Sequence, residues 1–116
     1  MKKNKTLIII LAIIAFFALL ILLGRLNKKP EMILFFGETC PHCKTVDAFI
    51  TDNGVRTKLK FQELEVYSNP SNSALLVQKA RQCGISTTGG VGVPLFFDGK
   101  NCFQGSDSII NFLKTK

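Results

Sequence analysis

The chain has 116 residues, is 47% apolar and carries a formal net charge of +7. A basic excess of this size is typical of nucleic-acid-binding proteins, but its distribution argues against that class. Six of the 15 Lys and Arg residues precede residue 30, where no acidic residue occurs, and residues 31–116 carry nine basic and eight acidic groups. The basic excess therefore belongs to the N-terminal segment, and we predict no nucleic-acid partner.

An unbroken apolar segment follows the first basic residues. Every residue from Leu7 to Leu23 is apolar, and Thr6 and Gly24 bring the stretch close to the roughly 20 residues that cross a bilayer. A cleaved signal peptide has a shorter apolar region that ends in a small-x-small motif, and the sequence around Gly24 offers no such motif. We therefore predict an uncleaved signal anchor in which residues 7–23 form a transmembrane helix in the lipid bilayer.

The anchor and its basic flanks are predicted to cover residues 1–29, and one compact domain is predicted over residues 30–116, with Pro30 ending a short linker. Basic residues lie on both sides of the apolar segment, and the slightly larger number before it favours a cytoplasmic N-terminus. Four cysteines in a small protein suit an oxidising compartment. We predict a single-pass membrane protein whose domain is extracytoplasmic, in the periplasm or at the cell exterior.

The sequence Cys40-Pro41-His42-Cys43 connects a predicted strand with a predicted helix. The apolar run Met32–Phe36 indicates a buried strand, and an apolar period of helical spacing follows the tetrad. With Cys40 as the helix cap, Pro41 takes the first helical position, where its missing N–H costs nothing, and Cys43 lies on the face that turns toward the core. This spacing lets the two sulfurs form a disulfide.

The two cysteines occupy unequal positions. Cys40 is predicted to be exposed at the positive end of the helix dipole, which stabilises a thiolate and makes Cys40 the nucleophile. Cys43 is predicted to attack the mixed disulfide formed at Cys40 and to release the partner. A protonated His42 favours the Cys40 thiolate, which stabilises the reduced form and makes the disulfide more oxidising. Thiol-disulfide exchange is therefore the predicted chemistry.

Two other kinds of site use similar motifs. A Cys-x-x-Cys pair is common in zinc sites, but zinc needs two further ligands and the next cysteines stand alone far downstream, so no metal site is predicted. The sequence Gly89-Gly90-Val91-Gly92 resembles a phosphate-binding loop in composition, yet no strand leads directly into it and no Gly-Lys-Ser/Thr follows. We predict instead that these glycines allow backbones to approach closely.

The elements of the domain follow the order βαβαββα. After the first strand we predict a helix from Cys40 to about Asn53, which Gly54 ends, and then a strand over about Lys58–Val66. The next helix is predicted to be capped by Asn69 and stopped by Gly84. A strand at Leu95–Phe97, a two-residue hairpin turn at Asp98-Gly99 and a strand at Asn101–Phe103 follow, and a last helix is capped by Ser106.

Three of these features together resemble the thioredoxin superfamily in its compact, glutaredoxin-like form. They are the tetrad after the first strand, Val93-Pro94 before the third strand, and the hairpin before the last helix, and the resemblance covers residues 31–116. It implies an α/β fold with a four-stranded mixed sheet flanked by helices. It also implies a cis peptide bond before Pro94, and it makes Val93, Pro94 and Thr39 substrate-binding positions.

The resemblance also implies an activity. The tetrad is similar to that of periplasmic dithiol oxidases of the disulfide-bond-forming system, which implies an enzyme that exchanges disulfides with protein substrates, in the oxidase direction, without a dissociable cofactor. Its catalytic residues are then Cys40, Pro41, His42 and Cys43, and a quinone-linked membrane oxidoreductase is the implied redox partner. Leu34 stands where thioredoxins carry a buried aspartate, so no proton relay is expected from that position.

Other functions stay open. The sequence Gly105-Ser106-Asp107 is similar to the glutathione-binding stretch of glutaredoxins, which leaves a glutathione- or donor-dependent disulfide reductase as an alternative. From another class, Cys40 and Cys43 could serve as thiolate ligands in a Cu(I)- or Zn-binding, metallochaperone-like domain. A thioredoxin-like scaffold without redox activity is a third alternative.

The second pair of cysteines is Cys83, at the end of a predicted helix, and Cys102, in the strand after the hairpin. In the implied topology both lie at the end of the sheet opposite the active site, where their sulfurs can meet. We predict a structural disulfide, which stabilises a small domain by about 3 kcal/mol on the loop-entropy model. Two reduced cysteines packed as small apolar residues are the alternative.

Overall fold

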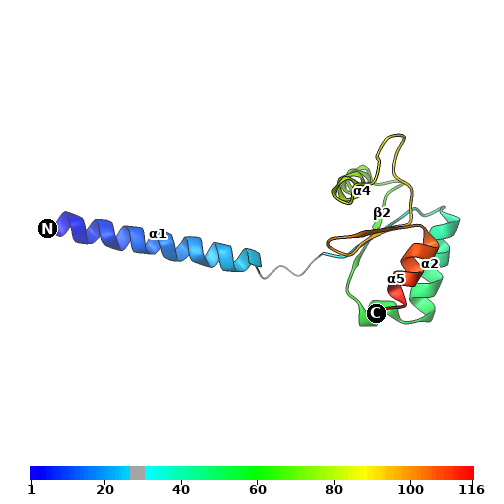
Figure 1. Ribbon diagram of the computed structural model, residues 1–116, viewed down its shortest axis with the longest axis horizontal. Coiled ribbons are helices and arrows are strands. Elements are labelled where there is room, and N and C mark those ends of the chain that lie inside the picture. Colours follow the sequence, from blue (N-terminus) through cyan, green and yellow to red (C-terminus); the bar gives the residue numbers. More distant parts are fainter. Residues whose placement is uncertain (27–30) are drawn as a thin grey trace.

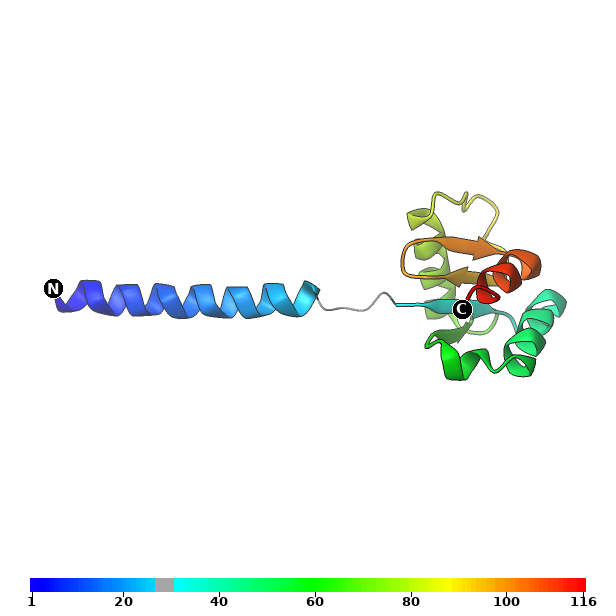
Figure 2. The same cartoon turned by 60° about the horizontal axis from the view of Figure 1, so that its bottom comes forward.

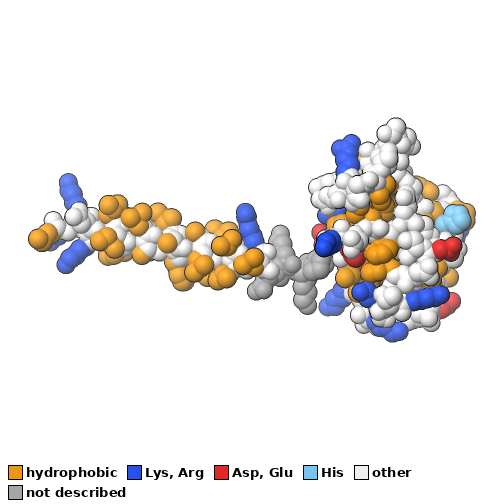
Figure 3. All heavy atoms as spheres, viewed as in Figure 1, with side chains coloured by type: hydrophobic (Ala, Val, Ile, Leu, Met, Phe, Trp, Pro, Cys, Tyr) orange, Lys and Arg blue, Asp and Glu red, His pale blue; other side chains and the backbone are white. Residues whose placement is uncertain are grey.

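The computed structural model describes residues 1–26 and 31–116 (Figure 1). Helix α1 (Lys2–Leu26) has 25 residues, and all of its side chains are exposed, including the apolar ones seen in Figure 3. Within the described part of the chain it is the one helix long and apolar enough to cross a membrane. At about 1.5 Å per residue its length exceeds the roughly 30 Å of a bilayer's hydrocarbon core. The predicted boundary between residues 29 and 30, including Pro30, lies outside the described residues.

One four-stranded sheet forms the centre of the domain. Its strands are β1 (Ile33–Phe36), β2 (Gln62–Glu65), β3 (Leu95–Phe97) and β4 (Cys102–Gln104), in the order β2-β1-β3-β4. Strand β1 pairs in parallel with β2 and antiparallel with β3, and β3 pairs antiparallel with β4. The predicted mixed sheet is therefore confirmed.

Helices cover both faces of this sheet (Figures 1 and 2). Helices α2 (Pro41–Asp52) and α5 (Ser106–Leu113) lie on one face, and α4 (Pro70–Gln82) lies on the other. Successive residues of β1 point to opposite faces, so Leu34 packs in the core under α2 and α5 while Ile33 and Phe35 pack in the core under α4. Burial on both faces explains why β1 reads as a continuous apolar run. Each large side chain buried there contributes roughly 1.5–3 kcal/mol.

The second strand is shorter than predicted. The sequence indicated a strand over about Lys58–Val66, but β2 covers only Gln62–Glu65, and Lys58 is the last residue of a short helix, α3 (Val55–Lys58). Gly54 adopts the expected left-handed conformation, with φ 59° and ψ 33°, and it is also the N-cap of α3. A helix of a single turn has no apolar period, which is why the sequence pattern did not show it.

Arg56 of α3 ties α2 to β2. Its guanidinium donates hydrogen bonds to Glu63 Oε1 and Oε2 at 2.8 and 3.0 Å, and it also donates to Asp47. The hydrogen bonds to Glu63, and next the hydrogen bond to Asp47, raise the pKa of Arg56 above its ordinary value. Because these side chains are largely exposed, such pairs contribute only about 0.2–1 kcal/mol each.

The hairpin turn and the cap of the last helix are each displaced by one residue from their predicted positions. The N–H of Asp98 donates to the carbonyl oxygen of Asn101 at 3.0 Å, so the two central residues of the turn are Gly99 and Lys100, and not Asp98 and Gly99. Gly99 supplies the positive φ, 101°, that such a turn requires. At the start of α5, Gly105 is the N-cap in place of Ser106.

The glycines of the loop after α4 serve a different purpose from the predicted one. A Cβ added at Gly89 or Gly90 would meet no atom within 4 Å, so neither position is held by close backbone approach. Both residues have positive φ, 77° and 98°, which explains the preference for glycine.

Candidate active site

Helix α2 begins where β1 ends, and its first turn carries the tetrad. Cys40 is the N-cap in an extended conformation, and Pro41 is the first helical residue. The backbone N–H of Cys43 donates to Cys40 Sγ at 3.1 Å, and the N–H of Cys40 donates to the carbonyl oxygen of Gly37 at 3.2 Å. The N-terminus of the helix thus directs a backbone donor at the sulfur of Cys40, as its position in the sequence predicted.

Cys40 and Cys43 are joined by a disulfide, with their Cα atoms 5.2 Å apart. Cys40 Sγ also lies 3.7 Å from the carbonyl oxygen of Val93. Cys40 is only 5% exposed, so the prediction of an exposed Cys40 is wrong for this disulfide form. Its sulfur is covered because the bond to Cys43 and the backbone of Val93 lie against it.

A groove of about 420 Å³ runs beside the disulfide. His42, Val93 and Pro94 line it together with Gln104, Gly105, Ser106, Asp107 and Ser108. The imidazole of His42 is exposed (Figure 3), and the peptide bond between Val93 and Pro94 is cis, as the resemblance implied. Three predicted site residues, His42, Val93 and Pro94, therefore line one groove. Thr39 is exposed in the turn that leads to Cys40.

Gln104 and Ser108 line this groove but were not among the predicted site residues. The antiparallel pairing of β4 with β3 sets Gln104 opposite Leu95, and the N–H of Gly105 donates to the carbonyl oxygen of Pro94 at 3.0 Å. The end of β4 therefore lies beside the Val93–Pro94 peptide bond. A usable signal was present in the sequence, because a hairpin that follows Pro94 directly must bring its second strand back to Pro94.

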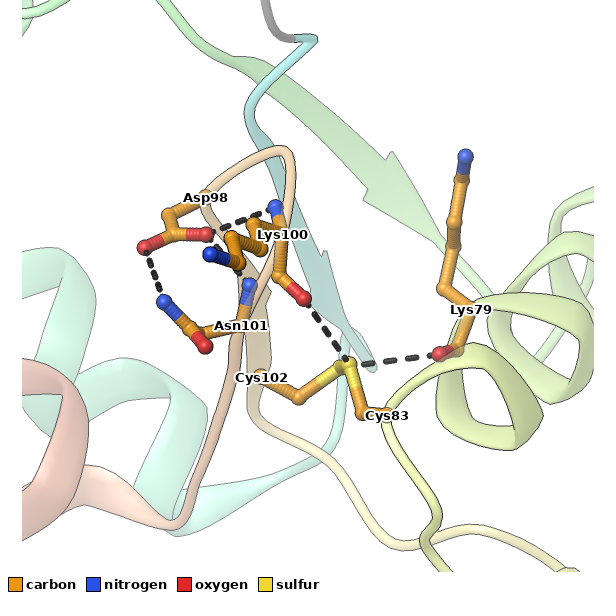
Figure 4. Close-up of a disulfide and its surroundings, with 6 residues drawn as sticks. All are labelled: Lys79, Cys83, Asp98, Lys100, Asn101 and Cys102. Atoms are coloured by element: carbon orange, nitrogen blue, oxygen red, sulfur yellow. Dashed lines mark hydrogen bonds between the residues drawn. A yellow bond between two sulfur atoms is a disulfide. The ribbon is translucent and has the colours of Figure 1, made fainter.

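The second pair of cysteines lies at the other end of the sheet. Cys83 and Cys102 are joined by a disulfide, with their Cα atoms 5.9 Å apart (Figure 4). Cys102 pairs with Phe97 in the sheet, and Phe97 pairs with Ile33 at the beginning of β1, whereas the tetrad follows the end of β1. The carbonyl oxygen of Lys100 lies 4.0 Å from Cys83 Sγ, and that of Lys79 lies 3.6 Å from Cys102 Sγ. This disulfide links α4 to the edge strand β4 and is remote from the groove.

The described residues also bear on metal binding. Among residues 1–26 and 31–116, no group of three or more His, Cys, Asp or Glu side chains is arranged to hold a metal ion.

Leu34, at the position of the thioredoxin aspartate, is an apolar core residue that is 3% exposed.

No protein-family model matches the chain, and a comparison with curated proteins yields no match either. The domain is similar to solved structures of glutaredoxins. The wheat glutaredoxin is 22% identical with a TM-score of 0.51, and the match covers 79% of this chain and 76% of that one.

Two further plant proteins give similar values. Glutaredoxin C1 in its holo form from Populus tremula x tremuloides is 21% identical, with a TM-score of 0.50 and coverage of 73% and 75%. The buckwheat glutaredoxin, solved as a complex with glutathione, is 20% identical, with a TM-score of 0.51 and coverage of 72% and 68%. The domain therefore has a glutaredoxin-like fold, with a cysteine pair that forms a disulfide at the start of α2.

Proposed function

We propose that the protein is a membrane-tethered thiol-disulfide oxidoreductase that oxidises dithiols of protein substrates. The observation that carries this proposal is the Cys40–Cys43 disulfide at the N-terminus of α2, with the backbone of Val93 beside it and a groove alongside. A disulfide placed next to a groove can receive a substrate thiolate. The hydrogen bond that the Cys43 N–H donates to Cys40 Sγ stabilises the Cys40 thiolate that remains after exchange.

The reaction transfers two electrons from the substrate to the tetrad. A substrate thiolate attacks Cys40 Sγ, which forms a mixed disulfide and breaks the bond to Cys43, so Cys43 leaves as a thiolate. The second thiol of the substrate then attacks the substrate sulfur of the mixed disulfide and releases Cys40. The substrate ends as a disulfide, and its two protons pass to the reduced cysteines or to solvent.

Repeated turnover requires an oxidant that accepts these two electrons. The proposed acceptor is a quinone-linked membrane oxidoreductase, which the tether would keep close to the domain. In the opposite direction the same groove would serve a glutathione-dependent reductase, an alternative favoured by the buckwheat complex and by the presence of Gly105 and Asp107 in the groove. Stoichiometric Cu(I) binding that survives glutathione competition, without disulfide exchange, would instead support metal handling.

The reduction potential decides between the two redox directions. We expect the full chain, in detergent and equilibrated against glutathione buffers, to show a Cys40–Cys43 potential near the oxidising end of its superfamily, about −120 mV. A value near about −270 mV would assign the protein to the reductases. Mass analysis after alkylation keeps Cys83 and Cys102 distinct from the active-site pair.

The same measurement tests the role of His42. Since a cation near the Cys40 thiolate stabilises the reduced form, His42→Ala should make the potential more negative by roughly 30 mV or more, which corresponds to about 1.4 kcal/mol for a two-electron couple. Lys58→Ala is the matched control, because Lys58 is an exposed cation and the cavities it lines include no residue of the tetrad. Equal shifts in the two variants would remove the special role of His42.

The tether and its orientation form the second part of the proposal. We infer that residues 1–29 anchor the protein through α1 and that residues 30–116 form the extracytoplasmic domain, as the oxidising chemistry requires. In right-side-out membrane vesicles, a membrane-impermeant maleimide should label the cysteines after reduction, and in inside-out vesicles it should not. Labelling confined to inside-out vesicles would place the domain in the cytoplasm, and loss of the protein on carbonate washing would exclude the anchor.

A further inference from the structure

Tyr67 has an unusual exposure for an aromatic residue of this domain. Within residues 31–116 it is the one large apolar or aromatic side chain that is exposed, at 59%. It follows β2 directly, in the segment that leads to α4. Tyrosine in such a position offers a broad, rigid contact surface at a low cost in conformational entropy, which is why it is enriched at protein recognition sites.

The backbone that carries Tyr67 is fixed by one carboxylate. The N–H of Tyr67 donates to Glu65 Oε1 at 2.7 Å, and the N–H and hydroxyl of Ser68 donate to Glu65 Oε2 at 2.9 and 2.7 Å. The side-chain amide of Asn72, in α4, donates to the carbonyl oxygen of Glu65 at 2.9 Å. The hydrogen bonds from Ser68 hold the pKa of Glu65 below its ordinary value, so the carboxylate is charged at neutral pH.

The ring of Tyr67 packs on the active-site turn itself. It occupies the space beside Gly37 so closely that a Cβ at that position would overlap the ring. Gly37 begins the turn that Cys40 closes, since the carbonyl oxygen of Gly37 accepts the N–H of Cys40. A side chain at residue 37 would displace the ring, and the φ of Gly37 is not positive, so close approach explains this glycine.

The order of the strands sets Tyr67 and Pro94 on opposite sides of the nucleophile. Strand β1 lies between β2 and β3, and the tetrad follows the end of β1. Tyr67 lies just beyond the parallel end of β2, and Pro94 lies just before the antiparallel β3. Consider a polypeptide substrate that lies along Val93 and brings its cysteine to Cys40. The residues that flank this cysteine would then extend past Cys40 toward Tyr67.

We propose that Tyr67 is a specificity-determining residue that packs against an apolar side chain next to the reacting cysteine of a polypeptide substrate. This inference rests on the proposed thiol-disulfide exchange and adds its substrate class, cysteines with apolar neighbours in unfolded or flexible chains. Tyr67 acts on substrate binding and does not take part in the exchange of sulfur bonds.

The test compares three dithiols in single-turnover reactions with the oxidised full chain in detergent. Two are peptides of equal charge that differ only in whether leucine or serine flanks each cysteine, and the third is dithiothreitol. For Tyr67→Ala we expect the rate constant with the leucine peptide to fall about tenfold, with changes below about twofold for the serine peptide and dithiothreitol. The potential of Cys40–Cys43 should stay at its wild-type value.

Three further variants control this comparison. Tyr67→Phe keeps the ring and should behave like the wild type, whereas Gly37→Ala moves the ring and should reproduce the selective loss. Arg81→Ala truncates an exposed side chain in the last turn of α4 and should change none of the rates.

Each remaining outcome has a definite meaning. Equal losses with all three dithiols, or a shifted potential, would make Tyr67 a structural residue of the turn and overturn the inference. An unchanged rate with the leucine peptide would overturn it as well, while leaving the proposed exchange intact. A wild-type chain that oxidises none of the three dithiols would refute the proposed function, and the inference with it.

Discussion

Disulfide transfer to a protein dithiol should fall by more than about a thousandfold in the Cys40→Ser variant of the full chain, because the substrate thiolate then has no disulfide to attack. The measurement is the single-turnover oxidation of a dithiol peptide, followed by mass after acid quenching. Cys40 is the expected point of attack since its sulfur lies beside Val93 and the groove, whereas Cys43 lies on the buried face of α2.

The Cys43→Ser variant should behave differently from Cys40→Ser. In this variant the Cys40 thiolate can still attack a substrate disulfide and form a mixed disulfide. No second thiol of the tetrad is left to break that bond, so the covalent complex should accumulate. Thr45→Ser, on the exposed side of the same helix, serves as the control for handling and folding. Accumulation of the complex on Cys43 in Cys40→Ser would reverse the two roles. Retention of the protein's biological function in Cys40→Ser, without disulfide transfer, would support a scaffold without redox activity.

The second large effect concerns stability. Cys83 and Cys102 are separated by 19 residues, and cross-linking a loop of this length stabilises the folded state by about 3 kcal/mol in the chain-entropy model. The double variant Cys83→Ser/Cys102→Ser should therefore lose about that free energy of unfolding, which for a domain of this size lowers the melting temperature by roughly 15 °C. Urea unfolding of the full chain in detergent, with the Cys40–Cys43 pair kept oxidised, measures the loss.

The reduced wild type is a second test of the same bond. After full reduction of both disulfides, the wild type should have an unfolding midpoint close to that of the equally reduced double variant, because both then lack the same covalent constraint. The potential of Cys40–Cys43 in the double variant should remain near the wild-type value, since the two pairs lie at opposite ends of the sheet. An unchanged unfolding midpoint in the double variant would show that this bond does not stabilise the domain.

The sequence was most informative at the ends of helices, where the local residue type decides the backbone conformation. Pro41 and Asn69 marked the starts of α2 and α4, and Gly54 marked the end of α2. These signals are local and depend on backbone geometry, so no knowledge of distant contacts was needed to interpret them. The mixed sheet and the cis bond before Pro94 followed from the resemblance to a known fold.

The features that sequence reasoning missed depend on contacts between distant segments. The short helix α3 has no apolar period of its own, and the covering of Cys40 results from a backbone 53 residues away in the chain. Tyr67 is a single aromatic residue between a strand and a helix, and its position beside Gly37 follows only from the parallel pairing of β1 and β2. Patterns of hydrophobicity do not report such pairings.

The Cys83–Cys102 bond also affects how the protein responds to proteases. It joins the two ends of a segment that contains the exposed Gly89 and Gly90 as well as Val93 and Pro94. Exposed loops of small residues are preferred sites of cleavage. Because the cross-link closes a covalent ring around this segment, a single cut at Gly89 or Gly90 leaves both fragments attached to one molecule. A nicked chain thereby keeps β3, β4 and α5 joined to the rest of the domain until a reductant opens the ring.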